Sequence, residues 1–170
     1  MKKMVLLCLL ALVSTLAFSQ SLKKYAISGT GCSVQSYCEP KFGITYSEDS
    51  ASVYTSECGG NDMYYIVICI DLKKSLSLSK AETSLNSYVN HLKTQFKVVS
   101  ATGYTSGNKL NGNDNTLGIS ETWKDNEQFN YKTKGWTDGK FIAVMIAYSK
   151  KDLPDATVNP FLEGLMFKGM

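Results

Sequence analysis

Arginine is absent from this chain, and histidine is almost absent. All 18 basic residues are lysines, and His91 is the one histidine among 170 residues. Arginine supplies the planar fork that binds phosphate, carboxylate or guanine through two hydrogen bonds, so its absence argues against nucleic-acid recognition and against an arginine clamp in an active site. A catalytic device that needs an imidazole would depend on His91, which falls on the polar side of a predicted helix. We therefore expect no nucleic-acid partner and no nucleophilic hydrolase.

Motifs for nucleophilic catalysis and metal binding are also missing. The chain has no Gly-x-Ser-x-Gly sequence around which a serine nucleophile could be built. Residues 111–115 begin like a calcium-binding loop, but Thr116 and Thr122 occupy the positions that require glycine and glutamate. A single histidine, together with cysteines suited to disulfides, argues against a zinc site. We expect no metal, no cofactor and no enzymatic activity.

The chain has no apolar run long enough to cross a membrane, which takes about 20 residues. Its longest apolar run, residues 4–18, follows two lysines and leads into the small residues Ala17 and Ser19, which is typical of a secretory signal peptide. We predict a signal peptide at residues 1–19 and a mature domain at residues 20–170 that is periplasmic or secreted, without a transmembrane segment. Cleavage leaves 16 lysines against 15 acidic residues, and this small net charge gives no strong field for a polyanion.

Four cysteines remain after cleavage, and an even number in an exported chain favours disulfides. A turn at residues 48–50 would bring Cys38 and Cys58 together at the open end of a hairpin, so we predict a bond between these two. Cys32 and Cys69 are then the second pair. A local bridge from Cys32 to Cys38 and a buried free thiol at Cys69 are the alternatives.

Two segments, residues 63–72 and residues 141–149, are apolar on both of their alternating faces. Strands of this kind lie in the interior of a sheet that is covered on both sides. Between them, residues 80–97 have the pattern of an amphipathic helix, with Ser79 as its N-cap and Glu82 as the capping-box partner. The inward stripe of this helix consists of Leu85, Tyr88, Val89, Leu92 and Phe96.

Shorter strands with one buried face are predicted along the rest of the chain. They cover residues 41–46, 51–57, 98–104, 116–124 and 127–136, with a further edge strand at residues 22–28. Residues 32–40 have an irregular pattern, and residues 105–116, which carry several Gly and Asn residues and little apolar character, are predicted to be the least ordered part.

Two further signals define the C-terminal part of the fold. Asp138 and Gly139 predict a type I′ hairpin turn, because both residue types accept positive φ. Asn159 and Pro160 predict the start of a short last helix. The inward residues of that helix are Phe161, Leu162, Leu165 and Met166. Together the elements predict one α+β domain, an antiparallel sheet of about six strands covered by one long helix and a short C-terminal helix.

The order of these elements resembles the PsbP-like proteins over about residues 38–168. Three features carry the resemblance: a Lys-Leu-Asn-Gly turn at residues 109–112, an Asp-Gly-Lys-Phe hairpin at residues 138–141, and a closing helix that ends at Phe167. The resemblance implies an α/β/α sandwich and an exported accessory or assembly role without catalysis. The paired cysteines depart from that family.

Aromatic residues of the C-terminal strands are candidates for a ligand site. Tyr104, Trp123, Tyr131 and Trp136 could line a groove, with Glu121 as its acid, since Glu121 falls on the apolar register of its strand. That arrangement would suit a sugar- or lipid-binding protein or a carbohydrate-active enzyme. Aromatic residues in strands more often fill the core, and a strand acid more often reaches solvent. Our leading expectation is therefore an exported non-catalytic protein of the bacterial cell envelope that binds another envelope or secreted protein, through a surface such as residues 105–116.

Overall fold

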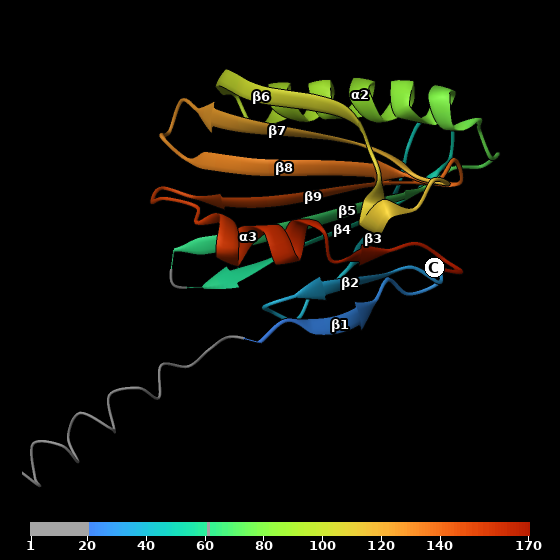
Figure 1. Ribbon diagram of the computed structural model, residues 1–170, viewed down its shortest axis with the longest axis horizontal. Helices are drawn as coiled ribbons and strands as arrows, with labels where there is room; N and C mark the ends of the chain where they lie inside the picture. Colours follow the sequence, from blue (N-terminus) through green and yellow to red (C-terminus); the bar gives the residue numbers. More distant parts are fainter. Residues whose placement is uncertain (1–20, 61) are drawn as a thin grey trace, which may run out of the picture.

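The computed structural model describes residues 21–60 and 62–170, so the predicted signal peptide lies outside the described residues. The described chain forms two antiparallel sheets and two helices, which confirms the predicted α+β class (Figure 1). The larger sheet has seven strands in the order β3-β4-β5-β9-β8-β7-β6, and the smaller sheet has three in the order β1-β2-β10. No helix within these two ranges is both long enough and apolar enough to cross a membrane.

The larger sheet contains nearly all of the predicted strands. Its members are β3 (Gly43–Tyr46), β4 (Ser52–Gly60), β5 (Met63–Asp71), β6 (Val98–Asn108), β7 (Leu117–Asp125), β8 (Asn130–Thr137) and β9 (Phe141–Ser149). β5 and β9 pair with each other, and each has a second neighbour, so both are interior strands as predicted. Their side chains are buried on both faces, which explains why neither sequence alternates between apolar and polar residues.

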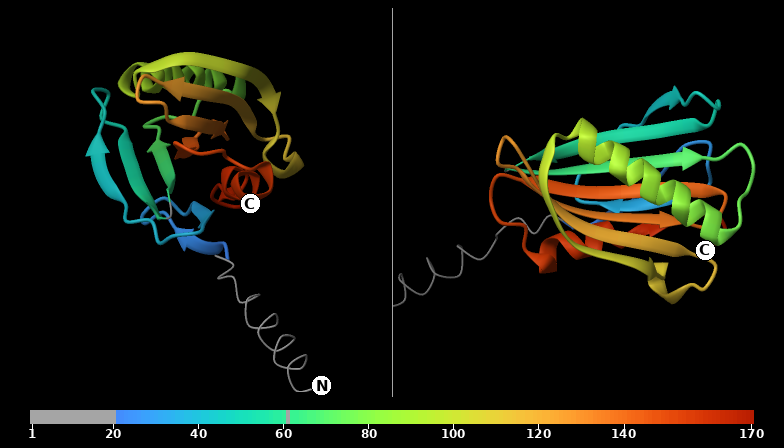
Figure 2. Two further views of the ribbon diagram at one scale, coloured as in Figure 1. Left: turned by 90° about the vertical axis from the view of Figure 1, so that its left-hand side faces the viewer. Right: turned by 90° about the horizontal axis from the view of Figure 1, so that it is seen from above.

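One face of the larger sheet is covered by α2 (Leu78–Gln95), which packs on β7, β8 and β9 (Figure 2). The predicted inward stripe is confirmed. Its fully buried members are Leu85, Val89 and Leu92, and Tyr88 and Phe96 pack beside them while half-buried.

The start of α2 differs from the prediction. Ser77 is the N-cap and makes no side-chain capping bond, while Ser79 lies inside the helix. Glu82 does not close a capping box, because its carboxylate accepts a hydrogen bond from the backbone N–H of Gly107 on β6 at 3.0 Å. A contact with the sheet therefore replaces the local contact and ties the helix to the sheet edge.

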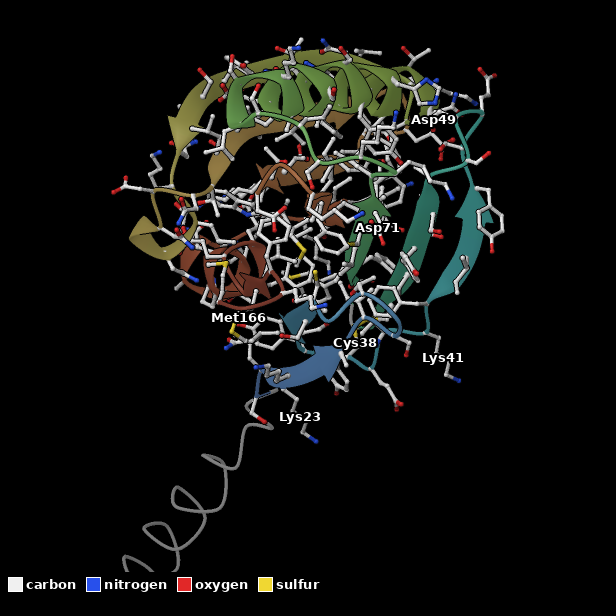
Figure 3. All side chains as sticks on the ribbon, turned by 90° about the vertical axis from the view of Figure 1, so that its right-hand side faces the viewer. Lys23, Cys38, Lys41, Asp49, Asp71 and Met166 are labelled. Carbon is white, nitrogen blue, oxygen red and sulfur yellow. A yellow bond between two sulfur atoms is a disulfide. The ribbon has the colours of Figure 1, made fainter. Side chains whose placement is uncertain are left out.

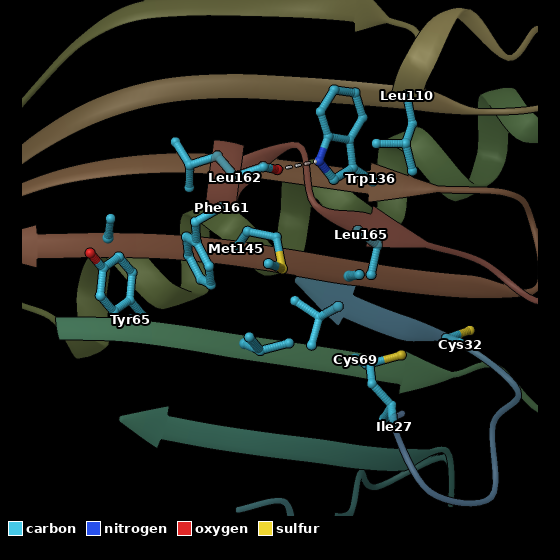
Figure 4. Close-up of a cluster of buried hydrophobic side chains, with 14 of the residues drawn as sticks. Ile27, Cys32, Tyr65, Cys69, Leu110, Trp136, Met145, Phe161, Leu162 and Leu165 are labelled. Atoms are coloured by element: carbon cyan, nitrogen blue, oxygen red, sulfur yellow. Dashed lines mark hydrogen bonds between the residues drawn. The ribbon is translucent and has the colours of Figure 1, made fainter. Parts of the chain in front are cut away.

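The opposite face is covered by α3 (Asp155–Leu162) and by the smaller sheet of β1 (Lys23–Ala26), β2 (Ser33–Ser36) and β10 (Leu165–Met166). Figure 4 shows the core on this side, which includes Tyr65, Trp136, Met145, Phe161, Leu162 and Leu165. The prediction that residues 32–40 are irregular is wrong, because β2 lies among them. Strands of four and two residues are too short to show a period in the sequence.

The last helix begins earlier than predicted. Pro154 is the N-cap, and Pro160 lies inside α3 instead of starting it. Phe161 and Leu162 are buried in the helix as predicted. Leu165 and Met166 are not part of it, since they follow the helix and pair with β2.

β6 runs past its predicted end at Tyr104 to Asn108. Gly103 and Gly107 have φ of 69° and 72° and lie where the pairing with β7 shifts register, so both form bulges that let the strand continue. A short 3-10 turn, η1 (Leu110–Gly112), follows, and Leu110 is fully buried. The prediction that residues 105–116 are the least ordered part is therefore wrong, because glycines that look like breaks in the sequence form bulges.

The turn between β8 and β9 is present at the predicted place but is not type I′. Gly139 has φ of 88°, whereas Asp138 does not have a positive φ. The Asp138 carboxylate instead accepts hydrogen bonds from the backbone N–H groups of Lys140 at 2.9 Å and Phe141 at 2.7 Å. The side chain therefore stabilises a different turn from the one that its backbone propensity predicts.

The disulfide between Cys38 and Cys58 is confirmed, with a Cα–Cα distance of 6.0 Å. Figure 3 shows Cys38 at the open end of the β3–β4 hairpin and Asp49 at its tip. Cys32 and Cys69, the predicted second pair, are both buried and carry free thiols in the structure. A bridge from Cys32 to Cys38 is excluded because Cys38 is bonded to Cys58, whereas a buried Cys69 thiol is what the structure contains.

Candidate binding surface

A row of four aromatic side chains crosses four neighbouring strands on the face that carries α2. Trp123 on β7 lies opposite Tyr131 on β8, Tyr131 lies opposite Tyr148 on β9, and Tyr148 lies opposite Tyr64 on β5. Residues directly opposite each other in an antiparallel sheet point to the same face and come within contact distance. We call these four residues the aromatic ladder.

The rings of the ladder are stacked along most of its length. The Tyr131 and Tyr148 centroids are 5.3 Å apart with planes at 18°, and those of Tyr148 and Tyr64 are 5.0 Å apart at 20°. Trp123 meets Tyr131 at 6.2 Å with a larger tilt. The next position on β4 is Gly59, where a Cβ would lie only 2.8 Å from the Tyr64 Cα, so the ladder ends at Tyr64.

The ladder passes from the core to the surface. Trp123 is 1 % exposed, Tyr131 is buried, Tyr148 is half-buried, and Tyr64 is 37 % exposed. Phe96, which follows α2, packs on the buried end, with its ring centroid 6.4 Å from Trp123 and 5.5 Å from Tyr131. Because α2 packs on β7, β8 and β9 but ends there, the helix leaves the Tyr64 end uncovered.

Phe129 separates two hollows beside the uncovered end. One, of about 290 Å³, is lined by Phe96, Tyr131 and Tyr148 among others, and the second, of about 200 Å³, is lined in part by Tyr64. Phe129 lines both and stands edge-on to Tyr148 at 5.5 Å. We call Tyr64, Phe129 and Tyr148 the aromatic shelf.

Carboxylates hold the shelf in place. Asp125 accepts hydrogen bonds from the backbone N–H groups of Glu127 at 2.8 Å and Phe129 at 2.9 Å, which fixes the loop that presents the Phe129 ring. Its second oxygen accepts a hydrogen bond from the Tyr131 hydroxyl at 2.7 Å, and the Glu57 carboxylate accepts one from the Tyr148 hydroxyl. The rings are therefore oriented by hydrogen bonds as well as by stacking.

The phenols of Tyr131 and Tyr148 stay protonated at neutral pH. Burial raises the pKa of Tyr131, and its hydrogen bond to Asp125 raises it further. Burial also raises the pKa of Tyr148, with an additional contribution from its hydrogen bond to Glu57. Since both hydroxyls are held as donors to carboxylates, neither is available as a base.

Charged groups of both signs surround the shelf. The Lys150 ammonium lies 4.7 Å from the centre of the Phe129 ring, and Lys151 pairs with Asp62 at 2.5 Å beside Tyr64. Within residues 21–60 and 62–170, no three His, Cys, Asp or Glu side chains are grouped closely enough to hold a metal ion. The arrangement offers aromatic faces with polar donors and acceptors at the rim, which suits binding through stacking and hydrogen bonds.

The five residues predicted as a ligand site do not form one groove. Trp123, Tyr131 and Glu121 share the α2 face, whereas Trp136 lies on the opposite face and donates its indole N–H to the Leu162 carbonyl at 3.1 Å. Tyr104 is exposed on β6, where its hydroxyl donates to the Asn86 side chain at 2.9 Å. The grouping of these five is therefore wrong, and the tryptophans fill the core.

Glu121 is buried on the predicted register, but its carboxylate is already paired. Lys93 of α2 lies 2.7 Å from one oxygen, and the indole N–H of Trp123 donates to the same oxygen at 2.8 Å. The carboxylate therefore links α2 to β7 and orients Trp123. Within this arrangement Glu121 has a structural role.

Tyr64 and Tyr148 were not predicted as site residues. Each lies near the end of a strand that is otherwise apolar on both faces, so neither stands out in the sequence. The pairing of β8 with β9 aligns Tyr148 with Tyr131, and the pairing of β5 with β9 then aligns Tyr64 with Tyr148. That register depends on strand neighbours far apart in the chain.

No family model matches the chain, and no curated protein matches it.

Proposed function

We propose that this protein is an exported, non-catalytic binding module of the bacterial cell envelope, and that the aromatic shelf is its binding surface. The observation that carries the proposal is the exposed Tyr64 ring, which is held by stacking on a row that continues into the core. A rigid aromatic side chain loses little conformational entropy on binding, and aromatic anchors dominate many protein interfaces. The partner would be another envelope or secreted protein.

Two further features support export and an accessory role. The Cys38–Cys58 disulfide is typical of proteins that fold in oxidising compartments, and the N-terminal sequence has the pattern of a signal peptide. The layout that resembles the PsbP-like proteins supports an accessory or assembly role. Fold resemblance alone does not determine function, so the surface itself has to be tested.

Affinity capture from an envelope fraction tests the proposal with three baits: wild type, Tyr64→Ala/Phe129→Ala, and Tyr104→Ala. Tyr104 is an exposed tyrosine outside the shelf and is the matched control. We expect one partner to be retained by wild type and by Tyr104→Ala but reduced at least about tenfold by the double change, the effect of losing ~1.4 kcal/mol or more of binding free energy. Equal capture by all three baits would show that the shelf is not the binding surface.

A small ligand is the second candidate, because the hollow of about 290 Å³ combines four aromatic rings with the acidic residues Asp125 and Glu127. A sugar could stack on Phe129 and hydrogen-bond at the rim. Thermal-shift screening against sugars and lipids separates the two candidates. A reproducible shift that Phe129→Ala abolishes, with no protein captured, would favour the small-ligand protein or a carbohydrate-active enzyme over the binding module.

A further inference from the structure

Two buried thiols meet at the junction between the two sheets. Cys69 lies in the interior strand β5 and is fully buried, and Cys32 lies directly before β2 and is 1 % exposed. Both belong to the same buried cluster, and Figure 4 shows their side chains next to each other where β5 passes the start of β2. They come from segments 37 positions apart that belong to different sheets.

The turn between β1 and β2 fixes the position of Cys32. The backbone N–H of Ile27 donates to the Cys32 carbonyl at 2.9 Å, and the Thr30 hydroxyl accepts the Cys32 N–H at 2.9 Å while donating to the Ile27 carbonyl at 2.7 Å. Gly29 and Gly31 have φ of 83° and 79°, which allows the tight reversal that these bonds require. The turn therefore presents Cys32 to β5 in a defined orientation.

We propose that Cys32 and Cys69 form a second disulfide when the exported chain is oxidised, and that this bond joins the smaller sheet covalently to the interior of the larger one. The bond would connect an N-terminal turn to the strand that pairs with β4 and β9. The proposal rests on the exported location but not on the aromatic shelf, so either can fail without the other.

The place of Cys32 on the N-terminal turn assigns the roles in this oxidation. Cys69 lies in an interior strand, whereas Cys32 lies on the turn that opens, so Cys32 is the thiol that an external oxidant reaches first. The Cys32 thiolate attacks an external disulfide, such as that of a thiol–disulfide exchange protein or oxidised glutathione. This attack forms a mixed disulfide and releases one thiolate of the oxidant.

The second step completes the exchange. Cys69 loses its proton and attacks the Cys32 sulfur, which releases the second thiolate of the oxidant. Two protein thiols are thereby oxidised to one disulfide, and one disulfide of the oxidant is reduced to two thiols, which take up the two protons. Because both cysteines are buried in the folded chain, the exchange takes place while the turn at residues 27–32 is open during folding.

The new bond would enclose the existing one, since Cys38 and Cys58 lie between Cys32 and Cys69 in the chain. In the unfolded chain the Cys38–Cys58 bond already shortens the path from Cys32 to Cys69. The second bond therefore closes an effective loop of roughly 20 residues. We expect the fully oxidised protein to melt roughly 5–10 °C above the protein that keeps only Cys38–Cys58.

Mass spectrometry of the full chain tests the bond. The wild-type protein is exported into an oxidising compartment, denatured in N-ethylmaleimide without reductant, and weighed intact. We expect no alkylated cysteine in the mature chain, four after reduction, and a proteolytic peptide pair that links Cys32 to Cys69. The same result is expected when reduced, unfolded protein is refolded with oxidised glutathione, which removes the dependence on export.

Two outcomes would overturn the proposal. One is alkylation at both Cys32 and Cys69 in protein that was refolded with oxidised glutathione and has an intact Cys38–Cys58 bond. The other is a peptide that links Cys32 to Cys38. A Cys32→Ala/Cys69→Ala variant supplies the matched control for stability: its melting temperature should match that of the protein with only Cys38–Cys58, and equality with the fully oxidised wild type would contradict the proposed effect.

Discussion

The two faces of the larger sheet are covered to different extents, and β4 shows the difference within one strand. Tyr54 and Ser56 are buried on the side of the smaller sheet, whereas Thr55 and Glu57, which alternate with them, are exposed on the side of α2. The cover on the side of the smaller sheet reaches β4, because Tyr54 belongs to the same buried cluster as Ile27 and Val34, whereas α2 packs on β7, β8 and β9. We call the face on the side of the smaller sheet the closed face, and the face on the side of α2 the open face.

Two cover elements bury the aromatic residues of one face, and a single helix leaves part of the other free for binding. On the closed face the aromatic residues Tyr65, Trp136 and Phe161 are all buried. On the open face the aromatic ladder begins buried and ends exposed at Tyr64. The difference teaches that aromatic content alone does not identify a binding surface; the extent of the covering layer decides which rings are free.

The largest expected effect comes from separating α2 from the open face. Leu92→Asp would place a charge in the buried seam of the helix, and we expect it to lower the free energy of unfolding by about 4 kcal/mol or more. Urea unfolding monitored by circular dichroism measures this. Asn90→Asp, on the exposed side of α2, is the control and should change stability by less than about 0.5 kcal/mol. An unchanged midpoint for Leu92→Asp would mean that α2 does not pack as described.

A second comparison tests the closed face against the open one. Phe161→Ala removes a fully buried ring and should cost about 3–5 kcal/mol of unfolding free energy, whereas Phe129→Ala removes a half-buried ring of the shelf and should cost about 1 kcal/mol. Urea titration of both variants gives the two values. Equal losses would show that the shelf is part of the core and not a surface held ready for a partner.

The sequence alone predicted those features of the two faces that depend on a local sequence pattern. Residues 141–149 form β9 with the predicted bounds, and α2 buries the predicted stripe, because long apolar periods leave one stable arrangement. The Cys38–Cys58 bond followed from the length of one hairpin. The smaller sheet did not follow, since β2 and β10 are short strands whose pairing joins distant parts of the chain.

The candidate site was harder to predict, for a physical reason. Glu121, Trp123 and Tyr131 were correctly placed near one another, but Trp136 points to the other face and Tyr104 lies on a strand that continues through two bulges. Tyr148 meets Tyr131 across the β8–β9 hairpin, but Tyr64 reaches Tyr148 only because β5 pairs with β9, a strand far from it in the chain. The sequence of a strand shows which face of the sheet each side chain points to. It does not show which strands lie next to each other.

A smaller effect is expected from the ion pair under α2. Lys93→Ala would leave the Glu121 carboxylate buried with Trp123 as its one remaining partner, and we expect a loss of about 1–3 kcal/mol of unfolding free energy. Adding Glu121→Gln should recover part of this loss, because the amide oxygen still accepts the indole proton without carrying a charge. A double-mutant cycle in urea measures the coupling. A negligible effect of Lys93→Ala, combined with loss of a ligand-induced thermal shift in Glu121→Gln, would return Glu121 to a role in ligand binding.

The smallest expected effect appears only at high pH and tests how well the closed face excludes water. Burial raises the pKa of Tyr65 from its ordinary value of 10 to about 12. Since the unfolded chain loses this proton near pH 10 and the folded chain keeps it to about pH 12, the contribution of Tyr65 to stability is full below pH 10 and falls by about 1.4 kcal/mol per pH unit between these values.

Tyr65→Phe should therefore lose stability less steeply than wild type from pH 10 to 12 in urea titrations. All other titratable groups are common to both proteins, so their effects cancel in the difference. Tyr46→Phe, at an exposed position on β3, is the control and should keep the wild-type slope. If Tyr65→Phe also keeps that slope, water reaches Tyr65 and the closed face is not sealed at this end of β5.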